Sequence, residues 1–279
     1  MRIVNAQAIT DAVSRLCVQA NYYLPDDVKR TIGHCRSHED WPAARDTLDK
    51  LAVNCQIAAE TSLPICQDTG VACVFLDIGQ DVHIEGSIKE AVDEGVRKGY
   101  REGYLRKSVV GDPLERKNTG DNTPAMLYID IVPGSNLTIT VAPKGFGSEN
   151  MSQIKMLRPS DGVNGITEFV LKVVEDAGPN PCPPIVVGVG IGGTFDKAAL
   201  LAKKALLRPL GIPNGKTHYA ALELTLLEKI NALGIGPQGF GGRTTALGVN
   251  IEAMPTHIAG LPCAVNLNCH VSRHATEVL

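Results

Sequence analysis

Apolar residues recur at three- and four-residue spacing in several stretches of the chain, which is the period of an amphipathic helix. In residues 5–20, for example, Val13 and Leu16 fall on the same face. Ser87 and Glu90 form a capping-box pair at the start of another such stretch. We expect helices over residues 5–20 and 42–60, from Ile88 to Tyr100, around 166–173, and over 194–207 and 216–233.

Shorter apolar runs, bounded by glycine, proline or asparagine, predict strands. These runs cover residues 71–78, 125–132, 137–142, 184–190, 245–251 and 261–267. The turn sequence PGSN joins the second run to the third and predicts that these two strands pair antiparallel. No repeat, linker or clear domain boundary interrupts the pattern. We therefore expect an α/β fold with one domain over 1–279, in which a mixed sheet or two small sheets are surrounded by helices, with a helical N-terminal part.

Composition and charge narrow the classes of partner. Hydrophobic residues make up 44% of the 279 positions, and 27 basic against 30 acidic residues give a net charge of −3. Because there is no basic stretch and only 4% of residues are aromatic, we expect no nucleic-acid partner. No run of 18 apolar residues occurs, so we expect no membrane association. Residues 1–16 lack a signal-peptide core, so we expect a cytoplasmic protein whose eight cysteines are thiols or metal ligands.

Three cysteines stand at the edges of predicted strands, among proline, glycine or amide residues. Cys66 lies in PICQDTG, Cys182 in NPCPP and Cys269 in VNLNCH. Three thiolates can hold three corners of a four-iron cluster and leave the fourth iron open as a Lewis acid. Taken singly, each of the three also fits a buried thiol. Cysteine behaves as a small hydrophobe inside helices and strands, and the remaining cysteines fall in such segments: Cys17, Cys35, Cys55, Cys73 and Cys263.

A GxGxxG pattern, formed by Gly188, Gly190 and Gly193, lies between a predicted strand and a predicted helix. A dinucleotide site also needs an acidic residue about 20 positions further on, and none occurs between Asp196 and Glu223. We interpret the pattern as a tight strand-to-helix turn, whose helix N-terminus could hold an anion. The segments KGFGSEN and GPQGFGGRTTALG lack the P-loop pattern and fit plain turns or carboxylate-binding loops equally well.

Two rival classes of metal site remain open at this stage. An iron–sulfur electron carrier or oxygen sensor usually has a fourth cysteine in a C-x₂-C run, and this chain has none. A zinc site could use Cys269, His270 and His274, although the chain has no paired-cysteine zinc pattern.

Five longer motifs extend the comparison beyond the cysteines. They are PICQDTG, KGFGSEN, CPPIVVGVGIGGTFDKAALLAKKALLRP, GIGPQGFGGRTTALG and MPTHIAGLPCAVNLNCH. Together they resemble the iron–sulfur (class I) fumarate hydratases, specifically the alpha subunit of the two-subunit form, a relative of the L(+)-tartrate dehydratase alpha subunit. The resemblance runs from about residue 10 to the C-terminus, and KGFGSEN looks more like fumarase than tartrate dehydratase.

The resemblance implies a [4Fe–4S] cluster held by Cys66, Cys182 and Cys269, and reversible hydration of fumarate to L-malate, a step of the tricarboxylic acid cycle. It implies that Asp68 and His257 are catalytic and that Arg106 grips a substrate carboxylate. The other residues that it implies in substrate binding are Gln67, Asp68, Gly145, Gly147, Ser148 and Asn150.

The resemblance also implies partners. The family's catalytic threonine and its other basic clamp residues belong to a second domain that has no counterpart here. We therefore expect a fumarase beta subunit, a small dicarboxylate substrate and a dimer of alpha–beta pairs. The alternatives are an L(+)-tartrate dehydratase or mesaconase alpha subunit, or, in another class, an iron–sulfur redox or sensor module.

Overall fold

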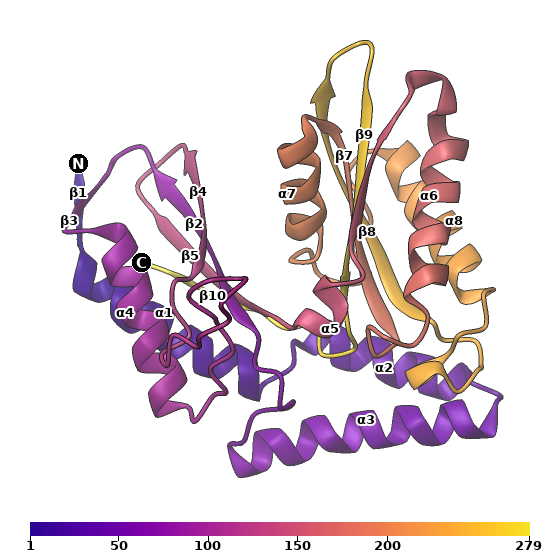
Figure 1. Ribbon diagram of the computed structural model, residues 1–279, viewed down its shortest axis with the longest axis horizontal. Helices are drawn as coiled ribbons and strands as arrows, with labels where there is room; N and C mark the ends of the chain where they lie inside the picture. The colour runs from indigo at the N-terminus through magenta and orange to yellow at the C-terminus, as the bar shows by residue number, and fades with distance from the viewer. The chain divides into compact units, whose positions relative to one another are not determined.

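The apolar stretches form the helices and strands that their periodicity predicts. A computed structural model describes residues 1–279, and each predicted element is present near its expected bounds (Figure 1). Helices α1 (Ala6–Tyr22), α2 (Asp26–His38) and α3 (Pro42–Thr61) make the N-terminal part helical, as expected. None of the helices combines the length and the apolar character needed to span a membrane. The chain divides into two compact units with one four-stranded sheet each, so of the two expected arrangements the one with two small sheets is confirmed.

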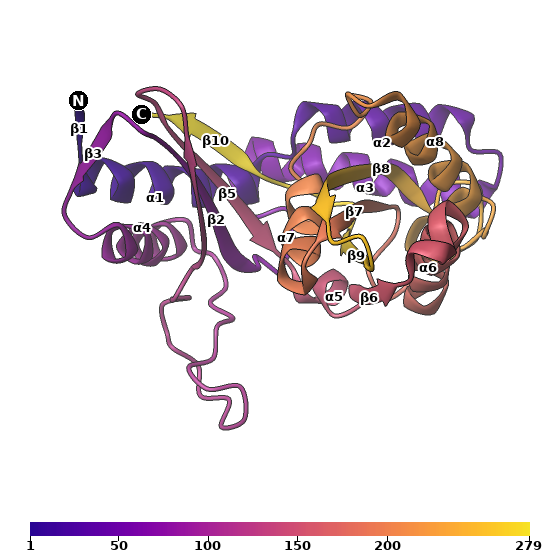
Figure 2. The ribbon, with the colours of Figure 1, turned by 90° about the horizontal axis from the view of Figure 1, so that it is seen from above.

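Unit 1 consists of Met1–Pro25, Cys55–Phe146 and Arg273–Leu279. Its sheet has the strand order β10-β5-β2-β4, with bounds Ala275–Val278, Leu137–Lys144, Val71–Gly79 and Met126–Val132. Helices α1 and α4 (Ile88–Glu102) lie side by side over one face of this sheet (Figure 2). Two short strands, β1 (Arg2–Asn5) and β3 (Val82–Glu85), form a separate parallel pair.

The close packing of α4 on α1 depends on two glycines. A Cβ atom at Gly95 would lie 2.7 Å from the carbonyl oxygen of Thr10, and one at Gly99 would lie 2.8 Å from that of Ser14. No larger residue fits at either position without moving a helix. Ser87 caps α4 through its side-chain oxygen, as the capping-box pattern predicts.

The predicted pairing of residues 125–132 with 137–142 is wrong. Strand β2 lies between β4 and β5, and it pairs parallel with β4 and antiparallel with β5. The reason is that β2 is buried along almost its whole length, which requires a neighbouring strand on each side. The turn at 133–136 closes over the end of β2, where the carbonyl oxygen of Asn136 accepts from the amide of Gly79 at 2.9 Å. The turn therefore spans a strand instead of joining two neighbours.

Unit 2 consists of Asp26–Asn54 and Gly147–Ser272, so the residues of α3 are shared between the units. Its sheet has the order β6-β9-β7-β8, with bounds Gln153–Leu157, Leu261–Asn268, Ile185–Gly193 and Ala246–Thr256. Helix α7 covers one face, and α6 and α8 cover the other (Figure 1). These helices span Phe195–Ala205, Gly162–Ala177 and Thr217–Asn231. The remaining helical turns are α5 (Phe146–Glu149), η1 (Pro159–Asp161) and η2 (Pro237–Gly239).

The GxGxxG pattern allows a helix to pack closely on the sheet. Gly188 and Gly190 lie within β7, where a Cβ atom would meet the carbonyl oxygens of Ala202 and Ala198 in α7. Gly193, with a φ of +67°, belongs to the turn that leads into α7. The predicted tight turn is therefore correct for the last glycine, whereas the first two permit contact between helix and sheet.

Candidate active site

The first candidate cysteine lies in a short loop before β2 in unit 1. Within this loop the amide of Asp68 donates to the sulfur of Cys66 at 3.4 Å. The Asp68 carboxylate accepts from the amides of Gly70 and Phe146, each at 3.1 Å. Both oxygens of the carboxylate are thus held by main-chain donors, while the side chain of Gln67 is exposed. The loop presents a sulfur and an oriented carboxylate two residues apart.

Two buried side chains, Tyr100 and Asn122, hold this loop in place through hydrogen bonds. The Tyr100 hydroxyl donates to the carbonyl oxygens of Thr69 and Gly70, at 2.7 and 3.1 Å. The Asn122 side chain donates to Gly70 at 3.2 Å and accepts from the amide of Ser108 at 2.7 Å. Burial raises the pKa of Tyr100 well above its ordinary value, so the hydroxyl stays protonated and donates. Sequence patterns gave no signal for Tyr100 or Asn122, because both contacts join residues distant along the chain.

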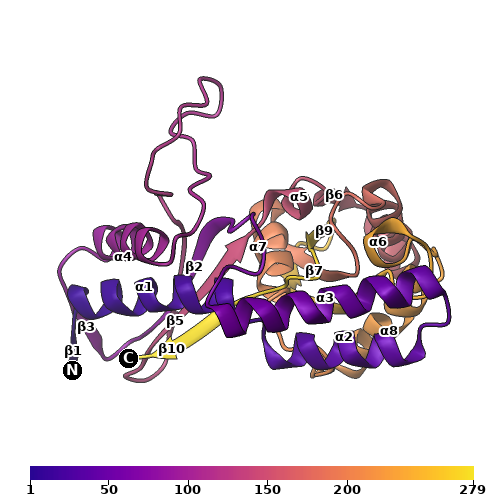
Figure 3. The same ribbon diagram turned by 90° about the horizontal axis from the view of Figure 1, so that it is seen from below.

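Arg106 lies beside Asp68 in unit 1. Its Nη2 is 3.6 Å from a carboxylate oxygen of Asp68, and its carbonyl oxygen accepts from the Thr69 hydroxyl at 2.8 Å. The Arg106 side chain is 54% exposed, so its guanidinium remains open to a further anion. Figures 2 and 3 show that the segment between α4 and β4, which carries Arg106, extends away from the helices of unit 1.

Gly145 contacts the same carboxylate. A Cβ atom at Gly145 would lie 3.1 Å from Oδ2 of Asp68, which leaves little room for any side chain. The structure therefore brings Cys66, Asp68, Arg106 and Gly145 together within unit 1. The arrangement offers one fixed carboxylate and one exposed cation next to a sulfur.

In unit 2, the segments that carry Cys182 and Cys269 lie side by side. Cys182 precedes β7 and Cys269 follows β9, and these strands are antiparallel neighbours. The carbonyl oxygen of Cys182 accepts from the amide of His270 at 3.3 Å, and Nδ1 of His270 lies 3.0 Å from the same oxygen. Cys182 is exposed and has a φ of +54°, a left-handed backbone that non-glycine residues seldom adopt.

The glycine-rich segment at 236–248 supports the Cys182 turn. The amide and the side chain of Gln238 both donate to the carbonyl oxygen of Pro183, each at 2.7 Å. The buried carboxylate of Glu39 accepts from the amide of Arg243 at 2.9 Å and from the Thr244 hydroxyl at 3.2 Å. The 236–248 segment is therefore anchored by Glu39, and through Gln238 it holds the turn that contains Cys182.

The remaining substrate-loop residues also belong to unit 2. Ser148 is buried and Asn150 is exposed, while a Cβ atom at Gly147 would lie 3.7 Å from the carbonyl oxygen of Asn180. The Glu149 carboxylate accepts from Lys203 at 2.6 Å and from Asn266 at 2.7 Å. Since Asn266 lies in β9, these bonds tie the loop to the strand that leads to Cys269.

His257 is not near Cys269. It lies in the exposed turn between β8 and β9, where its Nδ1 accepts from the amide of Ala259 at 3.1 Å. Cys269 follows the opposite end of β9, an 8-residue strand about 26 Å long at ~3.3 Å per residue. The structure therefore does not bring His257 to the cysteine end of the sheet that both residues flank.

The cysteines differ in burial and in how readily they form a thiolate. Burial raises the pKa of the Cys17 and Cys263 thiols to about 12, which disfavours the thiolate that binds iron. The three candidates, by contrast, are exposed or partly exposed: Cys66, Cys182 and Cys269. No three His, Cys, Asp or Glu side chains converge as a single metal ion requires, which applies to the zinc arrangement and to the three candidate cysteines alike. Thiolates that bind different irons of one cluster need not meet at one point.

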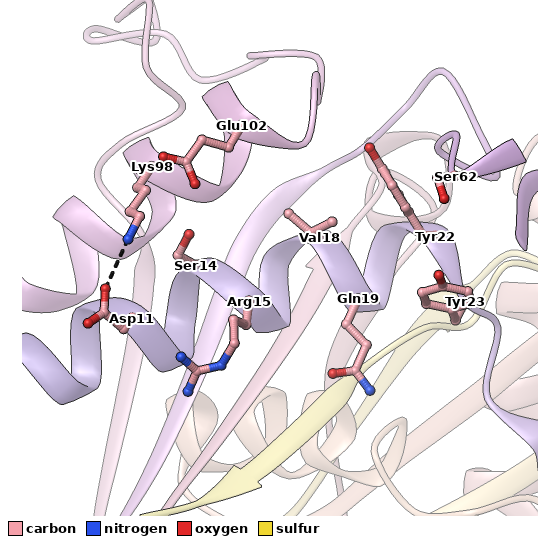
Figure 4. Close-up of a pocket in the computed structure, with 10 residues that line it drawn as sticks. All are labelled: Asp11, Ser14, Arg15, Val18, Gln19, Tyr22, Tyr23, Ser62, Lys98 and Glu102. Carbon is pink, nitrogen blue, oxygen red and sulfur yellow. Dashed lines mark hydrogen bonds and ion pairs between the residues drawn. The ribbon is translucent and has the colours of Figure 1, made fainter.

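A pocket of about 800 Å³ lies between α1 and α4 in unit 1, but it contains none of the expected site residues (Figure 4). Its charged groups are balanced. Lys98 pairs with Asp11 at 2.9 Å, and Arg15 pairs with Glu277 at 2.6 Å. A dicarboxylate would find no unpaired cation there.

Comparison with known proteins identifies the family of the chain. The family model for fumarate hydratase, called Fumerase, matches residues 10–278. A Methanocaldococcus jannaschii protein, provisionally named L(+)-tartrate dehydratase subunit alpha, is 46% identical over 276 residues, covering 96% of each chain. The L(+)-tartrate dehydratase subunit alpha of Escherichia coli K12 is 32% identical over 272 residues, covering 96% of this chain and 89% of its own.

These matches define the class of protein as a hydro-lyase subunit. Since the match extends over nearly the whole chain, the protein belongs to the Fumerase family. The relatives are named as alpha subunits, which implies a beta subunit as partner.

Proposed function

We propose that this chain is the alpha subunit of a two-subunit iron–sulfur hydro-lyase that adds water to, or removes it from, a four-carbon dicarboxylate. The observation that carries the proposal is that Arg106, from the segment after α4, lies beside the loop of Cys66 and Asp68, so that a sulfur, an oriented carboxylate and an exposed cation are neighbours. Cys66, Cys182 and Cys269 would hold a [4Fe–4S] cluster, which supplies an open, Lewis-acidic iron when bound.

The residues of this chain divide the remaining work. Arg106 binds a substrate carboxylate, because its planar guanidinium can donate two parallel hydrogen bonds. Asp68 accepts or returns a proton at its carboxylate, which the amides of Gly70 and Phe146 hold in a fixed orientation. Gln67 and the segment from Gly145 to Asn150 orient the substrate through amide and hydroxyl donors.

Two substrates fit this chemistry. L(+)-Tartrate is favoured by the names of the relatives. Fumarate, with L-malate as its hydrated form, is favoured by the KGFGSEN loop, which resembles that of the fumarases. Both are four-carbon dianions, so the carboxylate clamp alone does not separate them. The tricarboxylic acid cycle and the cytoplasm are the setting proposed for the fumarate alternative.

His257 can act at the cysteine centre only from a second alpha chain, because it lies at the far end of β9 from Cys269. This requirement agrees with a dimer of alpha–beta pairs. In that arrangement the imidazole of one copy would approach the Asp68 carboxylate of the other and share in proton transfer.

The beta subunit supplies what this chain lacks. A four-carbon dicarboxylate has two carboxylates, and Arg106 can bind only one of them. An open iron is also vulnerable to oxygen and needs a cover. We therefore propose that the active site is completed by a fumarase-type beta subunit.

The experiment is anaerobic reconstitution of the alpha chain with iron and sulfide, followed by assays with and without the co-expressed beta subunit. Fumarate, L-malate, L(+)-tartrate and mesaconate would be tested as substrates. The proposal expects turnover only in the complex, with one substrate preferred. A complex that binds iron and sulfide but turns over none of the four would favour a redox or sensor module, and full activity of alpha alone would refute a shared site.

A further inference from the structure

Arg273 is a buried cation without a counter-charge. The residue is only 4% exposed, and its Nη2 donates to the main-chain carbonyl oxygen of Asp68. Its Nε and Nη1 are buried and have no hydrogen-bond partner. No acidic side chain forms an ion pair with it. Burying a guanidinium that lacks a counter-charge and two of its hydrogen bonds lowers the stability of the fold, so its presence needs an explanation.

Elsewhere the chain neutralises its buried arginine in the ordinary way. Arg208, whose side chain is 17% exposed, forms ion pairs with Glu223 and Glu252. The absence of a carboxylate at Arg273 is therefore specific to that position. It sets Arg273 apart from the arginines that only stabilise the fold.

Direct binding of substrate does not explain Arg273. Its Nε and Nη1 each expose less than 1 Å² to solvent, so a dicarboxylate has no path to them. Arg106, which lies beside the Asp68 carboxylate and is 54% exposed, already has the accessibility that substrate binding needs. The negative charge that balances Arg273 must instead attract it through the loop to which Arg273 donates its hydrogen bond.

That loop contains Cys66. Asp68 connects the two residues. Its carbonyl oxygen accepts from Arg273, and its amide donates to the sulfur of Cys66 at 3.4 Å. A cluster held by three thiolates carries net negative charge, and a fixed cation close to one of the ligands offsets part of it. We propose that Arg273 has two roles. It positions the Cys66–Gly70 loop through its hydrogen bond to Asp68, and its fixed positive charge offsets the negative charge of the thiolate centre. This inference rests on the proposed function.

The test compares reduction potentials of the anaerobically reconstituted alpha–beta complex. A positive charge near a cluster favours its reduced form, so Arg273→Met should shift the potential to a more negative value. The same change should make oxidation easier and speed the loss of iron in air several-fold. Arg273→Lys keeps the charge and should restore the potential of the parent. Arg15→Met, which removes an exposed arginine of unit 1, is the matched control and should change neither quantity.

Semisynthesis keeps the test decisive if Arg273→Met fails to fold. A synthetic peptide of residues 269–279 can be ligated at Cys269 with citrulline at position 273, since citrulline is neutral, is close to arginine in shape and keeps an NH2 donor that can bond to the carbonyl oxygen of Asp68. The expected shift is the same. An unchanged potential and an unchanged rate of iron loss in the citrulline protein would overturn the proposal.

Failure of this inference is distinguishable from failure of the proposed function. If the parent complex assembles no iron–sulfur cluster, the proposed function fails before any variant is compared. If the parent holds a cluster whose potential is indifferent to the charge at position 273, the hydro-lyase proposal stands and the role of Arg273 is structural.

Discussion

The amide of His270 donates to the carbonyl oxygen of Cys182 at 3.3 Å, and this bond links the turn before β7 to the residue that follows Cys269. Two of the three candidate ligands are therefore positioned by main-chain contacts that do not involve their sulfur atoms. Replacing a cysteine by serine should accordingly remove the ligand and leave the local backbone in place.

Serine at position 66, 182 or 269 should abolish the visible absorption of the cluster and the activity of the alpha–beta complex. The reason is that a hydroxyl is a far weaker iron ligand than a thiolate. Cys35→Ser is the control, because burial raises the pKa of the Cys35 thiol and the residue lies outside the site. Full activity of Cys182→Ser would contradict the ligand assignment.

Arg106→Lys should raise KM about tenfold or more, equivalent to roughly 1–2 kcal/mol, with the cluster retained. Lysine keeps the charge but cannot donate two parallel hydrogen bonds to a carboxylate. Arg101→Lys, at an exposed position of α4, should leave KM unchanged. Steady-state kinetics on both variants decides the matter, and equal KM values would remove Arg106 from substrate binding.

Complementation tests whether His257 acts across two alpha chains. His257→Asn and Cys182→Ser should each be inactive or nearly so when expressed alone with the beta subunit. When the two variants assemble together at equal amounts, half of the dimers are mixed and each has one intact site. About a quarter of the parent activity should return. No recovery in proven mixed dimers would exclude action of His257 from a second copy.

Gly190→Ala should destabilise the protein by about 2–3 kcal/mol, because the added Cβ would meet the carbonyl oxygen of Ala198 and push α7 off the sheet. The control is Gly33→Ala in α2, where a Cβ would meet nothing within 4 Å. That change should stabilise the protein by about 0.5–1 kcal/mol through helix propensity. Urea unfolding at neutral pH measures both, and equal effects would rule out the packing explanation.

Asp121 should make stability depend on pH below its ordinary pKa of 3.8. Partial burial opposes its ionisation, but hydrogen bonds from Thr123 and Arg97 outweigh this and lower the pKa to about 2. Its contribution is therefore present above pH 3.8 and is lost as the pH falls towards 2. Asp121→Asn should cost about 1–2 kcal/mol at neutral pH, after allowance for partial exposure, and only a small part of that at pH 2, where the folded-state carboxyl is about half protonated. A gap between parent and variant that stays constant down to pH 2 would contradict this.

Local patterns predicted the helices and strands well, because the spacing of apolar residues in each segment depends only on which residues of that segment are buried. The same patterns mispredicted the partner of β4, since the insertion of β2 between β4 and β5 depends on a strand more than 40 residues upstream. The two units were also invisible in the sequence. Each is assembled from separated segments, so no linker composition marks where one ends.

Within the candidate site, three motif residues of unit 1 lie together, with Asp68 next to Arg106 and Gly145. The residues that hold them were not predictable. Tyr100 and Arg273 contact the Cys66 loop from 30 to 205 positions away in sequence, and neither belongs to a recognisable motif. Long-range contacts of this kind leave no periodicity for a sequence pattern to reveal.

The last seven residues of the chain, Arg273–Leu279, return to unit 1, whose other parts were made long before them. During synthesis, unit 1 therefore lacks its edge strand β10, and the arginine that donates to the carbonyl oxygen of Asp68, until this segment has been made. All of unit 2 has been synthesised by then. Folding during synthesis thus has a built-in order: unit 2 can fold first, and the Cys66 loop receives its contact from Arg273 only after all of unit 2 has been made.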